Sequence, residues 1–295
     1  MLYGFGSALV DRARDSLAND FYKRAEAAAG RAVEVLTQAA GISDDVPACV
    51  YKALGDAHTL SARFADTEPE VMAARLADGA AAYRRALELT PDDSGVHFDL
   101  GANALRRGDG AAAVASIKEA LRRAPRVGVY WVGLGLALRG EPKKAQHALI
   151  TALSMDERSE EAWNALATLY IDAGLFELAE RCLVMSQTIN VVSPVPWTLR
   201  GIIRELDRGR AVSGDAATAG IQNNETALDA YRHAVELGNT VEGRSGLGMC
   251  VSVCEYVCEC ECVSVCVCVL FVCWIVCFFA VAGANRTSPL PPCSL

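Results

Sequence analysis

The sequence contains none of the short motifs that mark common catalytic and nucleotide-binding sites. It has no H-E-x-x-H helix, no G-x-x-x-x-G-K-[ST] phosphate loop and no G-x-S-x-G turn. Its four histidines each stand alone on an expected helix, which predicts packing or surface roles. These are His58, His97, His147 and His233. We therefore expect a protein that is not an enzyme and that has no catalytic, cofactor-binding or metal-binding residues.

The chain also has few aromatic residues and no excess of basic charge. Of its 295 residues, 7% are aromatic, and the formal net charge is -8. Proteins that bind nucleic acid without sequence preference are usually basic, so the charge argues against that class. A content of 52% hydrophobic and 22% charged residues is typical of a globular chain. Alanine is frequent before residue 250, which favours closely packed helices.

Cysteine is scarce in the first part of the chain and dense in the last part. Only Cys49 and Cys182 precede residue 250, and the other cysteines begin at Cys250. We interpret residues 1–248 as a protein of a reducing compartment with two buried thiols. The opening stretch MLYGFGSALVDRARD is not a signal peptide, because no basic region precedes its apolar residues.

Four stretches repeat with a period near 34 residues, as in tetratricopeptide (TPR) repeats. The TPR pattern is W-x2-L-G-x2-Y on a first helix and A-x3-F-x2-A on a second, often followed by Pro. A weaker copy precedes them, with Tyr51, Leu54 and Gly55 at the first-helix positions. In the four stretches the matching residues are Leu100, Gly101, Ala113, Ala120, Pro125, Trp131, Leu134, Gly135, Ala145, Ala152, Trp163, Leu166, Tyr170, Ala179, Trp197, Gly201, Ala227, Tyr231 and Ala234.

The spacing of these residues has a physical cause. Residues at offsets 0, 3, 4 and 7 share one face of a helix. Trp and Leu then fill the gap between paired helices, Gly or Ala lets the backbones approach, and Pro125 stops its helix. Residues 1–248 are thus predicted to form an all-α, right-handed TPR superhelical solenoid of about six or seven antiparallel helix pairs. Irregular segments are expected at 62–79 and, as an insertion, at about 207–226.

The inner surface of the predicted solenoid is expected to be apolar to neutral. A carboxylate clamp for chaperone tails needs Lys, Arg and Asn on the first helices, and here only Asn164 suits it. The surface is therefore suited to an extended or helical protein segment. The solvent-facing positions considered are Phe98, Ala102, Val132, Leu136, Asn164 and Thr168.

A run of arginines at helical spacing follows Trp197. We interpret it as a solvated helix face, with a contact to RNA or an acidic partner as the alternative. The run consists of Arg200, Arg204, Arg208 and Arg210.

Beyond the repeat consensus, the order of segments resembles the TPR scaffold subunit of the superkiller (Ski) complex. The likeness lies in DVPACVYKALGDAHTL, HFDLGANALRRGD, YWVGLGLAL, KKAQHALITALSMDERSEEAWNALATLY and HAVELGNTVEGRSGLG. The resemblance implies a cytoplasmic, non-catalytic scaffold that holds an RNA helicase and WD-repeat subunits and supports 3′-to-5′ mRNA decay by the exosome. RNA would then be contacted only indirectly. Members of that family are far longer, so the chain resembles an internal fragment.

Residues 249–295 form a Val/Cys-rich tail of low complexity. Its cysteines never form C-x2-C pairs, which argues against a zinc site. Residues 263–282 carry no charge and are long enough for a membrane helix, so a membrane-tethered TPR adaptor is the alternative function. We favour a non-native tail, because residues 251–269 read as a GT dinucleotide repeat translated in frame, which a retained intron would supply. A third hypothesis is the repeat arm of a TPR-bearing transferase whose catalytic domain lies elsewhere.

Overall fold

The computed structural model describes residues 2–18, 21–42, 46–64, 69–213 and 227–242. Within these ranges the chain is helical and contains no strand. The helices are α1 (Leu2–Ala18), α2 (Tyr22–Ala40), α3 (Ala48–Ser61), the short 3-10 helix η1 (Ala62–Phe64), α4 (Pro69–Leu89), α5 (Ser94–Arg106), α6 (Gly110–Arg123), α7 (Gly128–Ala137), α8 (Pro142–Met155), α9 (Glu160–Asp172), α10 (Phe176–Ile189), α11 (Val195–Ser213) and α12 (Ala227–Glu242).

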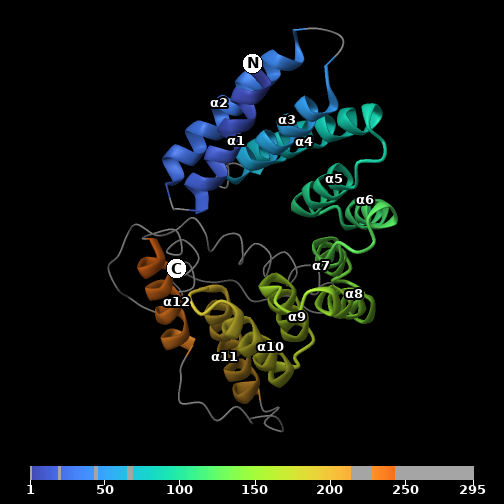
Figure 1. Ribbon diagram of the computed structural model, residues 1–295. Helices are drawn as coiled ribbons and strands as arrows, with labels where there is room; N and C mark the ends of the chain where they lie inside the picture. The colour runs from blue at the N-terminus through green and yellow to red at the C-terminus, as the bar shows by residue number, and fades with distance from the viewer. Residues whose placement is uncertain (1, 19–20, 43–45, 65–68, 214–226, 243–295) are drawn as a thin grey trace, which may run out of the picture.

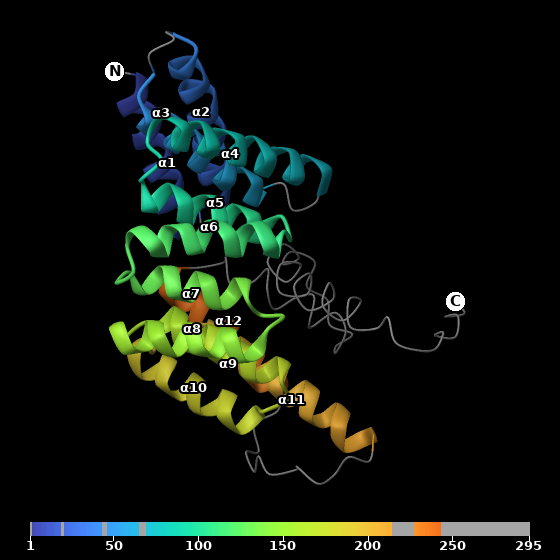
Figure 2. The same cartoon turned by 90° about the vertical axis from the view of Figure 1, so that its right-hand side faces the viewer.

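Consecutive helices pair and the pairs stack along a curved path. The closest packing joins α1 to α2, α3 to α4, and so on to α11 with α12. Each first helix also contacts the first helix of the next pair, from α1 through α11. In Figure 1, α5, α7 and α9 lie toward the inside of the curve, and α6 and α8 lie outside; Figure 2 shows the same pairs as stacked layers. The predicted all-α solenoid of TPR helix pairs is confirmed.

In every first helix except α9, a glycine lies against a large side chain of the partner helix. A Cβ added to these glycines would come within 2.2 to 2.6 Å of that side chain, so the two backbones approach only because the Cβ is missing. Ala167 occupies the same position on α9, which shows that the pair spacing can adjust to one methyl group. The pairs are Gly6 and Leu36, Gly55 and Tyr83, Gly101 and Ile117, Gly135 and Leu149, and Gly201 and Tyr231.

Alanines of the second helices complete the tight packing. Ala113 and Ala120 on α6, and Ala145 and Ala152 on α8, are at most 1% exposed. One apolar cluster runs without a break from Ile117 on α6 to Ile203 on α11. The small residues therefore build a continuous core in which each pair supports its neighbours.

Trp131 of α7 and Trp163 of α9 lie half-buried, and each bonds to the turn before its own helix. The Nε1 of Trp131 donates to the carbonyl oxygen of Pro125 at 2.8 Å, and the Nε1 of Trp163 donates to that of Glu157 at 2.9 Å. A ring nitrogen of His97 lies 2.9 Å from the carbonyl oxygen of Pro91 in the same relative position. These rings tie each inter-repeat turn to the helix that follows it.

Two segments expected to be irregular are partly helical. The stretch 62–79 contains η1 and the first half of α4, which begins at Pro69, a residue suited to a first helical turn. The expected insertion at 207–226 overlaps α11, which continues to Ser213, whereas residues 214–226 lie outside the described part. Gly and Asp misled the sequence interpretation here, because the Ala, Arg and Glu residues of the same segments favour helix.

The two cysteines of the described part differ in exposure. Cys182 on α10 is buried, as predicted, and burial raises the pKa of its thiol to about 11. Cys49 is exposed, so the prediction that it is buried is wrong. Cys49 lies in the first turn of α3, one residue before the buried Val50.

The interpretation of the arginine run as a solvated face is also wrong for its first two members. The side chains of Arg200 and Arg204 are 12% and 9% exposed. Both pair with Glu180 of α10, at 3.0 and 3.2 Å, and the Arg200 guanidinium lies 4.9 Å from the Trp197 ring centroid. The side chains of Arg208 and Arg210 lie outside the described part, as do residues 249–295 and the possible membrane segment 263–282. None of the described helices combines the length and apolarity that spanning a bilayer requires.

Candidate functional site

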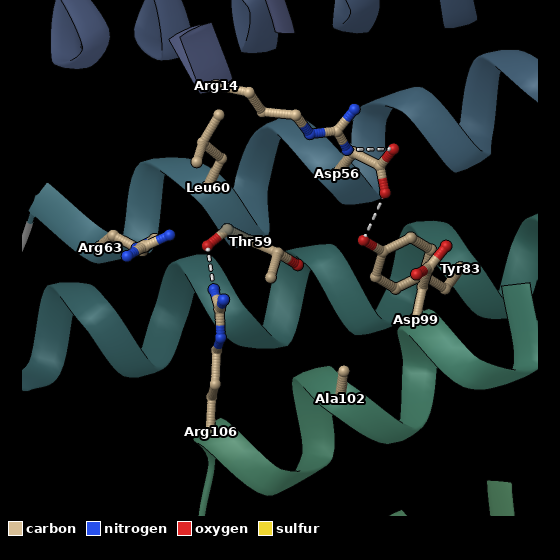
Figure 3. A pocket seen from close by; sticks show the side chains of 9 residues that line it. All are labelled: Arg14, Asp56, Thr59, Leu60, Arg63, Tyr83, Asp99, Ala102 and Arg106. Carbon is tan, nitrogen blue, oxygen red and sulfur yellow. Dashed lines mark hydrogen bonds and ion pairs between the residues drawn. The ribbon is translucent and has the colours of Figure 1, made fainter. Parts of the chain in front are cut away.

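The first helices α1, α3 and α5 enclose a polar pocket toward the amino-terminal end of the array. Its volume is about 530 Å³. Figure 3 shows its side chains arriving from four helices and from η1. The lining residues are Arg14, Asp56, Thr59, Leu60, Arg63, Tyr83, Asp99, Ala102 and Arg106.

One end of the pocket is acidic. Asp56 of α3 accepts hydrogen bonds from the Nη2 of Arg14 at 2.9 Å and from the hydroxyl of Tyr83 at 2.7 Å. These bonds hold Asp56 between α1 and α4. Burial, followed by the charge of Asp56, raises the pKa of the Tyr83 hydroxyl, so this group remains a donor.

Asp99 of α5 stands beside Asp56 at the same end. Its carboxylate lies 3.7 Å from the Nζ of Lys52. Burial, and then the charge of Asp56, raises the pKa of Asp99 to about 6, against the opposing charges of Lys52 and Arg14. The acidic end therefore holds two carboxylates and two cations that balance them.

The other end of the pocket is basic. The Nη1 of Arg106, at the end of α5, donates to the backbone carbonyl of Thr59 at 3.1 Å. Burial and the charge of Arg63 lower the pKa of Arg106. Among the described residues, no carboxylate forms an ion pair with either Arg63 or Arg106. Figure 3 places these two arginines together, across the pocket from Asp56, Tyr83 and Asp99.

Buried Asn103 fixes the wall behind the basic end. It is fully buried on α5, and its Nδ2 donates to the Oγ1 of Thr59 at 3.0 Å. Because Asn103 and Arg106 both bond to Thr59, α3 and α5 are held together at the point where the pocket narrows to its basic wall.

The prediction of an apolar to neutral inner surface is wrong at this end of the array. On α7 and α9 the surface at Leu136, Asn164 and Thr168 is uncharged, with Leu136 44% exposed. Val132 was also expected to face solvent, and that prediction is wrong, because its side chain is 7% exposed and packs in the core. The charges come instead from α1, α3, η1 and from Asp99 and Arg106 of α5. Part of this was readable in the sequence: Lys52 and Asp56 stand at the same repeat offsets on α3 as Phe98 and Ala102 on α5.

The chemistry available to the pocket is binding by charge and hydrogen bonds. In the part of the chain that the structure describes, no group of three or more His, Cys, Asp or Glu side chains is placed to hold a metal ion. Repeat-signature residues such as Gly135 and Ala145 are buried between paired helices. They do not line the pocket. The two arginines of the basic end were missed because they belong to no repeat motif.

Comparison with known proteins finds a relative by sequence and several solved structures that align with this chain. No protein-family model matches the chain. It is 25% identical over 281 residues to tetratricopeptide repeat protein 37 of Xenopus laevis, a match that covers 83% of this chain and 17% of the relative. The chain thus spans about a sixth of that relative's length.

Among solved structures, MamA of Desulfovibrio magneticus is 15% identical, with a TM-score of 0.46 over 62% of this chain and 94% of MamA. The Thermus thermophilus TPR protein TTC0263 is 18% identical, with a TM-score of 0.45 over 60% and 89%. YrrB, a TPR protein with an unusual peptide-binding site, is 18% identical, with a TM-score of 0.41 over 68% and 91%.

Proposed function

We propose that this chain is part of a non-catalytic TPR scaffold that holds other proteins together in the cytoplasm. The observation that carries the proposal is the continuous inner layer of first helices, from α1 through α11, which offers one extended surface to a partner. A stack of helix pairs buries its core between pairs and leaves this layer free to bind extended or helical segments.

We propose further that the scaffold is the TPR subunit of the Ski complex. The support is the likeness of five sequence stretches, together with a relative that is itself a tetratricopeptide repeat protein and matches over most of this chain. The partners would then be an RNA helicase and WD-repeat subunits, with the exosome receiving the mRNA for 3′-to-5′ decay. RNA would reach the scaffold only through these subunits.

The test is affinity purification of the tagged full chain from cytoplasmic lysate, with RNase present, followed by mass spectrometry. Recovery of the helicase and the WD-repeat subunits is the expected result, and RNase ensures that RNA does not bridge them. Recovery of other proteins without these subunits would contradict the Ski assignment and leave the scaffold. Recovery of no specific partner by a folded chain would contradict both.

A pair of leucine variants tests whether the inner surface is the one that binds. Leu136→Asp introduces a charge on α7 at a 44% exposed inner position, and Leu178→Asp does the same on the second helix α10, where the leucine is 39% exposed. Partners held by the inner layer should be lost with Leu136→Asp and retained with Leu178→Asp. Equal loss in both variants would place the docking surface elsewhere.

A further inference from the structure

We propose that the pocket between α1, α3 and α5 binds a side-chain carboxylate of an acidic peptide segment from a partner protein, with Arg63 and Arg106 as the binding residues. This inference rests on the proposed scaffold function and specifies the chemistry of one partner segment. It concerns a site that lies outside the repeat motifs and that the packing of three different repeats creates.

The pocket has an excess of positive charge at the end formed by Arg63 and Arg106. Arg14 is neutralised by Asp56, at 2.9 Å, and Lys52 lies 3.7 Å from Asp99. Two cations remain, Arg63 and Arg106, which have no carboxylate partner among the described residues. Burial and the charge of Arg63 lower the pKa of Arg106. One added carboxylate facing both guanidinium groups would relieve this repulsion.

Arg106 has donors to spare for such a ligand. A guanidinium carries five N–H donors, and the bond to the Thr59 carbonyl uses one of them. The bond also fixes the side chain, so that less conformational freedom is lost when a ligand binds. Arginine binds carboxylates with paired, charge-assisted hydrogen bonds, which are stronger in a partly buried site than in open solvent.

The acidic end sets the direction in which a peptide enters. Arg14 and Lys52 already face Asp56 and Asp99, so the acidic end has no free cation for a carboxylate. The acidic side chain of the peptide therefore lies at the Arg63 and Arg106 end, and its backbone N–H groups or a basic side chain lie toward Asp99.

The same arginines favour a peptide over RNA. RNA carries a phosphate at every nucleotide, and two aspartates within the same pocket oppose a continuous polyanion. Single-stranded RNA is also held by stacking on exposed aromatic rings, whereas the pocket's Tyr83 is 2% exposed. Binding of RNA is therefore an outcome to be tested against the proposal.

The experiment selects random linear peptides on the full chain and measures the best of them by fluorescence anisotropy. The probes are that peptide with an amidated carboxyl terminus, the same peptide with a free carboxyl terminus, the amidated peptide with its acidic residues changed to amides, and poly(A). We expect enrichment of Asp and Glu in the selected peptides. Arg106→Gln should weaken the amidated peptide about tenfold or more, because charge-assisted hydrogen bonds are lost.

The matched control is Arg107→Gln, the exposed neighbour on the same helix end, which does not line the pocket and should change binding less than about twofold. Arg63→Gln is the second test variant, because Arg63 is exposed and its loss spares the core. Thermal unfolding followed by circular dichroism shows that each variant is folded.

Several outcomes overturn the proposal. They are peptides without acidic residues, equal effects of Arg106→Gln and Arg107→Gln, binding only of the peptide with a free carboxyl terminus, and Arg106-dependent binding of poly(A) in preference to the peptide. If Arg106→Gln does not affect partner recovery and no acidic peptide binds, the proposed binding role of the pocket is refuted. The proposed scaffold function is then retained. If an acidic peptide binds in an Arg106-dependent way but no Ski subunits are recovered, the peptide-binding role of the pocket is supported. The Ski assignment is then refuted.

Discussion

The ring of Tyr83 lies directly over the Cα atom of Gly55: a Cβ on Gly55 would stand 2.5 Å from the ring's Cε1. The hydroxyl of the same ring donates to Asp56, one residue further along α3, at 2.7 Å. Tyr83 thus has two roles: its ring packs against the repeat glycine Gly55, and its side chain also lines the polar pocket. The repeat core and the candidate binding site are mechanically linked at this point.

Gly55→Ala should destabilise the chain by about 1–3 kcal/mol, because the ring cannot retreat without breaking its bond to Asp56. The matched control is Gly30→Ala on α2, where a Cβ meets nothing within 4 Å. That change should stabilise by up to about 1 kcal/mol, through helix propensity alone. Urea unfolding of the full chain measures both, and equal effects would contradict the close contact.

Trp131→Phe should cost about 1 kcal/mol, because it removes the indole N–H that bonds to the Pro125 carbonyl while keeping an aromatic ring in place. Tyr130→Phe is the control: its hydroxyl makes only a 3.4 Å contact with the hydroxyl of Ser94. Differential scanning calorimetry compares the two variants. A larger loss in Tyr130→Phe would show that the indole bond does not secure the turn.

Asp99→Asn should change how stability depends on pH. In the folded chain burial and the charge of Asp56 raise the pKa of Asp99 to about 6, above its ordinary value, so folding favours the protonated form. Its ionised carboxylate therefore destabilises the fold as the pH rises through about 6, and this effect disappears below about 4.

The amide should thus stabilise the chain by about 1 kcal/mol at pH 7.5, allowing for partial exposure and for the loss of Lys52 as a partner, and should have little effect at pH 4.5. Urea unfolding at the two pH values measures the difference. Glu34→Gln, at an exposed position on α2, is the control. A gain at pH 4.5 that is lost at pH 7.5 would reverse the sign and refute this account.

Cys49 and Cys182 should differ in reactivity. Iodoacetamide should modify Cys49 in the native chain and reach Cys182 only after denaturation, because Cys182 is buried and its pKa is raised to about 11, which leaves little thiolate. Mass spectrometry of the digested chain resolves the two sites from the cysteines after residue 249. Equal native labelling rates would contradict the burial of Cys182.

Sequencing of cDNA across the codons for Gly248 and Met249 tests the origin of the tail. If residues 249–295 arise from a retained intron, most transcripts should continue from Gly248 into further TPR codons. A dominant transcript that carries the Val-Cys run would support a genuine tail, and with it the membrane-tethered alternative.

Residue spacing alone was enough to predict helix pairs with close packing. Whether Gly135 faces its partner helix depends on the fixed turn of a helix, and the same offsets from Trp131 recur in every repeat. Burial at such positions follows from local geometry that any TPR pair shares. The ends of the elements were harder to predict: α11 continues through residues 207–213 although Asp207, Gly209 and Ser213 make the composition loop-like.

The pocket and the exposure of single side chains were decided by how the pairs stack. Arg14, Arg63 and Arg106 belong to three different repeats, and only the curvature of the solenoid brings them to one cavity. Arg204 looked solvent-facing on its own helix, but Glu180 of the preceding pair covers it. Periodicity describes one helix at a time, whereas charges that meet across repeats depend on rotations between pairs, which no local pattern encodes.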